Sequence, residues 1–328
     1  MTPKVFIDGE SGTTGLQIAQ RLGARKDIEL LHLDAEERRD AARRAEMLNA
    51  ADVSILCLPD EAAREAVSMV DGGARIIDAS TAHRTAPGWT YGFPEYDAAR
   101  PAQIARSARV SNPGCYALGA VCMLHPLVIN ELLPAGHPVT INAISGYSGG
   151  GRKLIAAFED PESPDATDSE FYLYGLDLEH KHVPEIQQHG SLTKRPLFVP
   201  SVGRFAQGMI VSLPLQLWSL PGAPKAKELH EALAEHYAGR DGEQGVHVAS
   251  MEESAEEQAV ARHLSGMPHA DAEAMTGTDR LTIHVFANQA REQAVICAVL
   301  DNLGKGAAGL AVQNLELMLG LSQVPGNK

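Results

Sequence analysis

The residue most able to do chemistry is a cysteine that follows a Pro-Gly pair. Cys115 stands in the sequence Ser-Asn-Pro-Gly-Cys-Tyr (111–116), and an apolar run with helical spacing follows it. This pattern predicts a tight turn that brings the thiol to the first turn of a helix. Unpaired N–H groups and the positive end of the helix dipole favour a thiolate there. Cys115 is therefore a candidate nucleophile; the alternative is a thiol that only packs at a turn.

Three further cysteines lie in apolar surroundings. Cys57 and Cys297 belong to apolar, strand-like runs, and Cys122 lies on the apolar face of the helix that Cys115 is expected to start. Such cysteines usually behave as small buried hydrophobes. The four cysteines lack the spacing of a disulfide framework, which fits a protein of the reducing cytoplasm.

Two histidines are candidates for proton transfer. His180 and His182 lie in the segment His-Lys-His-Val-Pro-Glu (180–185). Clustered histidines can ligate a metal, but no Cys-x-x-Cys or His-Glu-x-x-His spacing accompanies them, so we predict no metal site. Imidazole titrates near neutral pH and suits an acid or base that works with a thiol. We therefore expect one of these histidines to act with Cys115.

Two arginines are candidates for binding an anionic substrate. Arg84 follows an expected strand and the residues Asp-Ala-Ser-Thr-Ala-His (78–83), and Arg152 follows three glycines (149–151). Guanidinium groups bind carboxylate and phosphate, and glycine-rich loops expose N–H groups to anions. The alternatives are a surface charge for Arg84 and a flexible connection for the glycine loop.

A glycine-rich loop lies near the start of the chain. An expected strand (4–8) runs into Gly-Glu-Ser-Gly-Thr-Thr-Gly (9–15) and then into an expected helix (16–22). Glycines let such a turn approach a pyrophosphate, which then sits at the helix N-terminus. Thr14 and Gln17 have capping-box spacing, which supports a helix start here. The loop predicts dinucleotide binding, and the alternative is a tight turn without a ligand.

The residues after the second expected strand leave the choice of dinucleotide open. Asp34 occupies the place where an acid usually binds the ribose 2′-hydroxyl of NAD. Arg38 and Arg39 follow and are able to neutralise the 2′-phosphate of NADP. Alternatively, these charges are the solvated face of a helix.

The elements that must position these residues alternate between strand and helix in the first part of the chain. The expected strands are 4–8, 29–33, 52–58 and 75–78, and the expected helices are 16–22, 35–48 and 60–70. This alternation predicts an α/β domain with a doubly wound parallel sheet, which binds ligands beyond the carboxyl ends of its strands.

The pattern changes after Cys115 and predicts an α+β domain with a mixed or antiparallel sheet. The expected strands are 139–144, 197–199, 209–217, 281–286 and 294–300, the polar segment 160–170 is expected to be exposed, and an apolar helix (308–321) closes the chain.

The bulk composition narrows the class of protein. A chain of 328 residues is long enough for two domains. Its net charge of -14 argues against a nucleic-acid-binding surface. No apolar run approaches the roughly 20 residues of a membrane span, and no signal-type segment precedes the first strand. We expect a cytoplasmic protein without a nucleic-acid or membrane partner.

Five motifs occur in an order that resembles one enzyme family. They are the Gly-x-x-Gly-x-x-Gly loop (9–15), Ser-Asn-Pro-Gly-Cys-Tyr (111–116), Ser-Gly-Gly-Gly-Arg (148–152), His-Lys-His-Val-Pro-Glu-Ile (180–186) and Asp-Asn-Leu-Gly-Lys-Gly-Ala (301–307). Together they resemble the N-acetyl-gamma-glutamyl-phosphate reductase family, within the aspartate-semialdehyde dehydrogenase superfamily. The short chain and Leu-Cys-Leu-Pro-Asp (56–60) look like the shorter of the family's two sequence types.

The resemblance implies an NADP-binding Rossmann domain (1–112 with 302–328) and a catalytic and dimerisation domain (113–301). It implies cofactor contacts from Gly9, Ser11, Gly12, Thr13, Thr14, Gly15, Arg38, Arg39 and Asn302. It implies substrate contacts from Arg84, Asn112, Arg152 and Glu185. Asp34 fits NAD better than the family's NADP(H). Because Arg38 and Arg39 are able to neutralise the 2′-phosphate, we predict NADP(H). A homo-oligomer, dimer or tetramer, is expected through an apolar edge of the second sheet.

The implied reaction begins with attack of the Cys115 thiolate on an acyl phosphate, which expels phosphate and leaves a thioester. Hydride from NADPH then gives the aldehyde, N-acetyl-glutamate 5-semialdehyde. His182 is the favoured acid because Glu185, three residues on, can orient it, and His180 is the fallback. Backbone N–H groups around Cys115 are expected to stabilise the oxyanion.

Two other functions remain open from the sequence. One is reduction of a different acyl phosphate, such as aminoadipyl or aspartyl phosphate, because thioester chemistry is common to the superfamily. The other is a nucleotide-sensing binding protein in which Cys115 has no role, and the Pro-Gly-Cys-helix setting argues against it.

Overall fold

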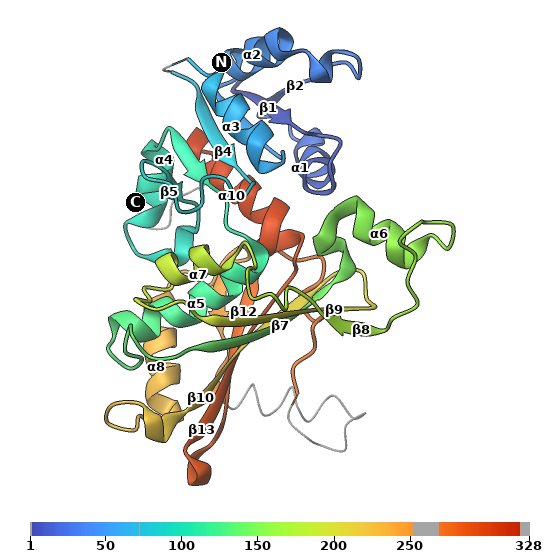
Figure 1. Cartoon of the computed structure of the whole chain (residues 1–328). Coiled ribbons are helices and arrows are strands. Elements are labelled where there is room, and N and C mark those ends of the chain that lie inside the picture. Colours follow the sequence, from blue (N-terminus) through green and yellow to red (C-terminus); the bar gives the residue numbers. More distant parts are fainter. Residues whose placement is uncertain (1, 72, 252–268, 322–328) are drawn as a thin grey trace. The chain divides into compact units, whose positions relative to one another are not determined.

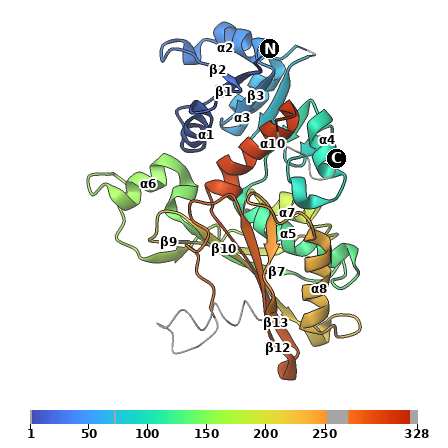
Figure 2. The same ribbon diagram turned by 180° about the vertical axis from the view of Figure 1, so that it is seen from behind.

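A computed structural model describes residues 2–71, 73–251 and 269–321 of the chain. The chain forms two compact units, one from residues 1–114 with 307–328 and one from residues 115–306. Figure 1 and Figure 2 show the elements of both units from opposite sides. The residues 322–328 of the expected Rossmann domain lie outside the described residues.

The first unit contains a parallel sheet of six strands in the order β2-β1-β3-β4-β6-β5. The strands are β1 (Lys4–Asp8), β2 (Glu29–Leu31), β3 (Val53–Leu56), β4 (Arg75–Asp78), β5 (Thr90–Tyr91) and β6 (Arg109–Ser111). The helices are α1 (Thr13–Gly23), α2 (Ala41–Ala50), α3 (Asp60–Ser68), α4 (Arg100–Arg106) and α10 (Gly309–Leu319). Parallel neighbours need crossover connections, and α1, α2, α3 and α4 each lie between two successive strands of this sheet, whereas α10 comes from the end of the chain.

The two faces of this sheet bury two separate cores. Val5 and Ile7 of β1 point to one face and pack with residues of α1, α4 and α10. Phe6, between them, points to the other face and packs with Leu48 of α2 and Ala63 of α3. Successive side chains of a strand alternate between faces, so both faces need apolar residues when helices cover both. The prediction of a doubly wound sheet is confirmed.

Two predicted helix boundaries in this unit were wrong. Helix α1 begins at Thr13 rather than at residue 16, with Gly12 as its N-cap, so Thr14 lies inside the helix and the predicted capping box does not form. The predicted helix 35–48 begins only at Ala41, because the Asp40 side chain accepts hydrogen bonds from the N–H groups of residues 42 and 43 and caps it. The residues before the cap form a short 3-10 turn, Glu37–Arg39.

The second unit contains a mixed sheet of seven strands in the order β11-β12-β13-β10-β7-β9-β8. The strands are β7 (Thr140–Gly146), β8 (Phe171–Leu173), β9 (Leu197–Gly203), β10 (Met209–Gln216), β11 (Val246–Val248), β12 (Leu281–Asn288) and β13 (Gln293–Leu300). The helices are α5 (Cys115–Ile129), α6 (Gly151–Glu159), α7 (Val183–His189) and α8 (Ala226–Tyr237). The prediction of a mixed sheet is confirmed, but the three-residue strands β8 and β11 were missed.

Helix α5 is buried along nearly all of its length. It packs against α7 and α8 and against strands β10 and β13 (Figures 1 and 2). At Gly119 the approach is so close that an added Cβ atom would lie 2.6 Å from a methyl carbon of Val211. This close packing holds the first residue of α5 in a defined position.

Candidate functional site

Cys115 is the first residue of α5, as its Pro-Gly setting predicted. The residue is half-buried, so its side chain is partly accessible. A Cβ atom on Gly306 would lie 2.8 Å from the Cβ atom of Cys115, so only glycine fits beside the cysteine. The structure thus places a thiol at the amino end of a 15-residue helix, where the helix dipole favours its anion.

The other three cysteines are packing residues, as expected. Burial raises the pKa of the Cys57 and Cys297 thiols to about 12. For Cys57 the nearby carboxylates of Asp78 and Asp8 raise the pKa further. The buried Cys122 donates its thiol proton to the carbonyl oxygen of Gly119, 3.0 Å away. These environments oppose thiolate formation at Cys57 and Cys297.

Aromatic rings and imidazoles cluster beside Cys115 in the second unit. The ring of Tyr116 lies 5.9 Å from each of the rings of His180 and His182, measured between centroids. The two imidazoles are 4.8 Å apart. Phe198 of β9 packs edge-on against His180 at 5.1 Å and against Tyr116 at 5.4 Å. The structure therefore brings both predicted histidines next to the residue that follows the cysteine.

A second tyrosine, which the sequence did not reveal, completes this cluster. The hydroxyl of Tyr174 lies 3.4 Å from Nε2 of His180. Burial raises the pKa of Tyr174 to about 12, and negative charge on Cys115 raises it as well. Burial likewise raises the pKa of Tyr116, with Tyr174 and Cys115 contributing. Both phenols therefore stay protonated at neutral pH and lie close enough to feel a thiolate.

His182 occupies the N-cap position of α7 and is buried. Glu185, in the first turn of the same helix, is only 1% exposed. Its carboxylate has the position that the helix dipole favours for a negative charge. Its role in orienting His182 stays a prediction.

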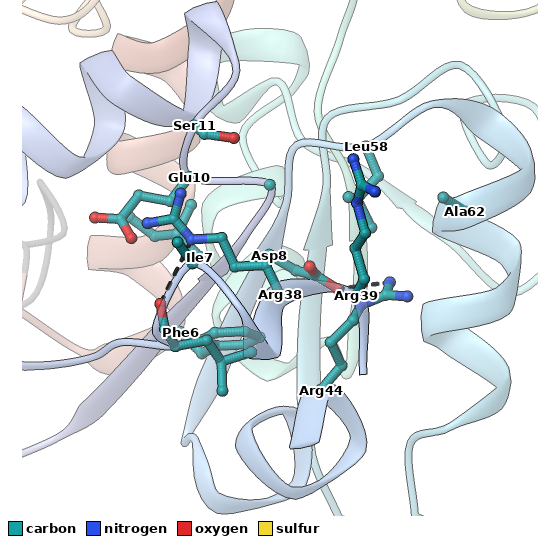
Figure 3. A pocket seen from close by; sticks show the side chains of 13 residues that line it. Phe6, Ile7, Asp8, Glu10, Ser11, Arg38, Arg39, Arg44, Leu58 and Ala62 are labelled. Atoms are coloured by element: carbon teal, nitrogen blue, oxygen red, sulfur yellow. Dashed lines mark hydrogen bonds and ion pairs between the residues drawn. The ribbon is translucent and has the colours of Figure 1, made fainter. Parts of the chain in front are cut away.

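A pocket of about 510 Å³ in the first unit is lined by four of the nine predicted cofactor residues, Gly9, Ser11, Arg38 and Arg39. Its lining residues are Phe6, Ile7, Asp8, Gly9, Glu10, Ser11, Leu33, Ala35, Arg38, Arg39, Arg44, Leu58 and Ala62. Figure 3 shows the guanidinium groups of Arg38 and Arg39 at this pocket. Both arginines are exposed and lie on the 3-10 turn before α2, so the interpretation as solvated charges and that as cofactor contacts both stay predictions.

The glycine loop is a tight turn in which the backbone packs too closely for a side chain at two positions. Gly9 has φ +89°, and an added Cβ atom would lie 2.4 Å from the carbonyl oxygen of Cys57. A Cβ atom on Gly15 would lie 2.4 Å from the carbonyl oxygen of Gly9. The turn closes with a hydrogen bond of 2.9 Å from Gly12 N–H to Gly9 O. Thr13 and Thr14 therefore form the first turn of α1, where backbone N–H groups are available to a phosphate.

The three arginines of the pocket differ in their partners. Arg44 is buried and donates two hydrogen bonds to the same oxygen of Asp8, at 2.9 and 3.1 Å. Within the described part of the chain, Arg38 and Arg39 pair with no carboxylate, and Arg38 donates only to Leu33 O at 3.4 Å. Arg44 is thus neutralised, and the other two carry the positive charge of the pocket.

Arg84 and Asn112, both predicted to bind substrate, meet in the first unit. Nε of Arg84 donates to Asn112 O, and a terminal nitrogen donates to Ala79 O, both at 3.0 Å. The Asn112 side chain donates to Ala307 O at 3.1 Å and accepts from Asn314 at 3.0 Å. Asn112 therefore holds the turn before Cys115, and a direct substrate contact from its side chain stays a prediction.

The two remaining predicted residues lie in the second unit. Arg152 is exposed on the first turn of α6. Asn302 is 1% exposed; its amide donates to Ser148 Oγ at 2.9 Å and accepts from Gly208 N–H at 2.7 Å. These bonds make Asn302 part of the scaffold, so its cofactor contact stays a prediction.

No described helix has the length and hydropathy needed to cross a membrane. Within residues 2–71, 73–251 and 269–321, no three histidine, cysteine or acidic side chains group as metal ligands do.

Family models match most of the chain. Residues 4–104 match "Semialdehyde dehydrogenase, NAD binding domain", and residues 115–302 match "Semialdehyde dehydrogenase, dimerisation domain". The chain is 54% identical over 320 residues to the N-acetyl-gamma-glutamyl-phosphate reductase of Chelativorans sp. (strain BNC1), covering 97% of this chain and 99% of that protein. It is 51% identical over 322 residues to the protein of the same name from Brucella ovis, covering 98% and 100%.

Solved structures with low sequence identity share the fold. Aspartate semialdehyde dehydrogenase II from Vibrio cholerae is 16% identical with a TM-score of 0.66, covering 98% of this chain and 99% of that one. Aspartate semialdehyde dehydrogenase from Francisella tularensis is 12% identical with a TM-score of 0.68, covering 97% and 100%.

Proposed function

The chain belongs to the N-acetyl-gamma-glutamyl-phosphate reductase family, and we propose that it reduces N-acetyl-gamma-glutamyl phosphate to N-acetyl-L-glutamate 5-semialdehyde and phosphate with NADPH, in arginine biosynthesis. The observation that carries this proposal is Cys115 at the start of α5 with two imidazoles clustered against Tyr116. A thiol so placed suits attack on an activated carboxyl group.

The first step forms a bond between Sγ of Cys115 and the acyl carbon and breaks the bond from that carbon to the phosphate oxygen. The helix dipole at Cys115 favours the thiolate that attacks. The N–H groups in the first turn of α5 are our candidate donors for the tetrahedral oxyanion. Phosphate leaves, and a thioester remains on Cys115.

NADPH, when bound, would supply hydride to the thioester carbon. His182 then gives a proton to the oxygen atom that becomes negative, and it takes the proton back when the C–S bond breaks and the aldehyde leaves. His182 is buried at the N-cap of α7. Arg84 and Arg152 are our candidates for binding the substrate phosphate and carboxylate.

The cofactor preference rests on the pocket of the first unit. Arg38 and Arg39 line it without a carboxylate partner among the described residues, whereas Asp34 is exposed and does not line it. Positive charge at this place suits the 2′-phosphate of NADP(H) and gives no advantage to NAD(H).

The proposal is tested by running the reaction backwards with purified protein, a semialdehyde, NADP⁺ and inorganic phosphate. We expect NADPH formation with N-acetyl-glutamate semialdehyde, dependent on phosphate or arsenate, and very little with aspartate semialdehyde. Cys115→Ala is expected to abolish it, and Cys122→Ala is the matched control. A preference for the aspartate or aminoadipate aldehyde refutes the named substrate and retains the thioester mechanism. Full activity of Cys115→Ala refutes the mechanism.

We also propose that the protein is a homo-oligomer and that it is cytoplasmic. The second unit matches a dimerisation domain, and Phe171 and Leu173 on the edge strand β8 are 54% and 47% exposed. Apolar side chains on a sheet edge are commonly covered by a subunit. Light scattering of the purified protein tests this, and a monomer at all concentrations contradicts it.

A further inference from the structure

A row of hydrogen-bonding groups runs beside Cys115, and the backbone fixes both of its ends. At one end, the backbone N–H of His182 donates to Nδ1 of His180 at 3.2 Å. At the other end, the hydroxyl of Tyr116 donates to the carbonyl oxygen of Ser201, in β9, at 3.0 Å. Between these ends stands Tyr174, 3.4 Å from Nε2 of His180 and hydrogen-bonded to Tyr116.

The fixed ends determine the direction of every bond between them. A neutral imidazole has one donor and one acceptor nitrogen. Since Nδ1 of His180 accepts an N–H, its proton lies on Nε2, which then donates to the hydroxyl of Tyr174. The hydroxyl of Tyr116 donates to Ser201 O, so its oxygen accepts from Tyr174; the side chain of Ser145 also hydrogen-bonds to Tyr116. In this arrangement the hydroxyl of Tyr174 accepts from His180 and donates to Tyr116.

Packing holds the members of this row in place. Tyr116 is 4% exposed, and Phe198 packs edge-on against both Tyr116 and His180. Ser201 is anchored by its own hydroxyl, which donates to Ala143 O at 2.6 Å. Burial that raises the pKa of Tyr174 to about 12 keeps its hydroxyl protonated over the range in which histidine titrates. The row therefore keeps its direction at neutral pH.

We propose that this row holds His180 as the neutral Nε2–H tautomer, which makes Tyr174 a positioning residue and leaves His182 as the imidazole that carries the catalytic proton. If Nδ1 of His180 were protonated, its N–H would point at the backbone N–H of His182, and the hydrogen bond between them would be lost. Two imidazolium rings 4.8 Å apart would also repel each other. The thiolate of Cys115 favours one imidazolium nearby, and His182 is the one able to supply it. The catalytic part of this inference rests on the proposed function.

The tautomer is tested first on the resting enzyme by NMR of histidine rings labelled with ¹⁵N. The chain has 13 histidines, so the His180 signals are assigned as those missing from His180→Gln. We expect one neutral ring protonated at Nε2, unchanged between about pH 6 and about pH 8. In Tyr174→Phe the acceptor for Nε2–H is lost, and we expect His180 to exchange between tautomers or to titrate.

Kinetics then test the positioning role. We expect Tyr174→Phe to lower kcat roughly threefold to tenfold, the effect of one hydrogen bond, with little change in KM. The acidic limb of its pH profile is expected to shift, because a second imidazole now competes for the proton. Tyr172→Phe is the matched control: Tyr172 is a half-buried tyrosine two residues earlier, stacked on Phe158, and we expect it to leave both readouts unchanged.

The outcomes separate the two proposals. A wild-type His180 that is protonated on Nδ1, or that titrates between about pH 6 and about pH 8, overturns the inference. So does a Tyr174→Phe variant with unaltered kcat and pH profile. If the wild-type protein shows the Nε2–H tautomer but reduces no acyl phosphate, the proposed function fails and the hydrogen-bond assignment stands.

Discussion

Removing Arg38 and Arg39 is expected to weaken the binding of NADPH and to leave that of NADH nearly unchanged. Both guanidinium groups line the pocket of the first unit and are exposed, without a carboxylate partner among the described residues. A hydrogen bond to a charged group contributes about 1.5–3 kcal/mol, and solvent exposure argues for the low end. Each replacement by alanine should therefore raise the Kd of NADPH about tenfold, and the double variant about 100-fold.

The measurement is a fluorescence titration of the intact protein with each nucleotide at one fixed ionic strength, because salt screens exposed charges. Arg43→Ala is the matched control. Arg43 is a half-buried arginine on α2 that pairs with Glu37 and Glu46 and does not line the pocket, so it reports the loss of a nearby positive charge outside the pocket. We expect it to change neither affinity more than about twofold.

Equal losses of NADPH and NADH affinity in the Arg38 and Arg39 variants would refute the reasoning. Arg44 also lines the pocket but is unsuitable as a control, because it pairs with the buried Asp8. Its replacement would leave a buried carboxylate without its partner, at a cost of about 3–5 kcal/mol in the free energy of unfolding.

The remaining predictions concern the histidines and the buried thiols. We expect His182→Asn to lower kcat by roughly 10²–10⁴, and His180→Asn to lower it much less, measured by steady-state kinetics; the reverse order would exchange their roles. We also expect the free energy of unfolding to fall as the pH rises from 9.0 toward about 12, because Cys57 and Cys297 ionise in the unfolded chain before they ionise in the folded one. Urea unfolding at about pH 8 and about pH 10 measures this decrease in the free energy of unfolding, and Cys297→Ala should make the decrease smaller. A decrease in that variant equal to that of the wild type would contradict this explanation.

The sequence predicts the elements best where one local pattern determines them. Strands β1 and β4 begin and end where expected, because each is a short apolar run bounded by charged residues or glycine. The start of α5 at Cys115 was also predicted, since Pro-Gly ends one segment and apolar spacing begins the next. In contrast, β5 has two residues and β11 has three, and such strands exist because a longer neighbour pairs with them.

Helix α5 shows how a distant residue overrides a local rule. Proline inside a helix removes the bond from its missing N–H to the carbonyl four residues earlier. Here Pro126 leaves the carbonyl of Cys122 without that partner, and the helix nevertheless continues to Ile129. The hydroxyl of Tyr237, at the end of α8, donates to Cys122 O at 2.9 Å. The sequence separation of 115 residues puts this compensation beyond any local pattern.

The same distinction explains which parts of the candidate site the sequence could predict. The setting of Cys115 depends on its own turn and helix, so residue types and spacing suffice to predict it. The proton of His180 depends on Tyr174, which follows β8, and on Ser201 in β9, and those strands pair antiparallel. In the sequence only the spacing to Glu185 distinguishes the two histidines, whereas in the structure a tyrosine hydroxyl lies beside one ring, that of His180. The assignment of chemical roles within a motif therefore needs the tertiary structure, even where the motif itself is unmistakable.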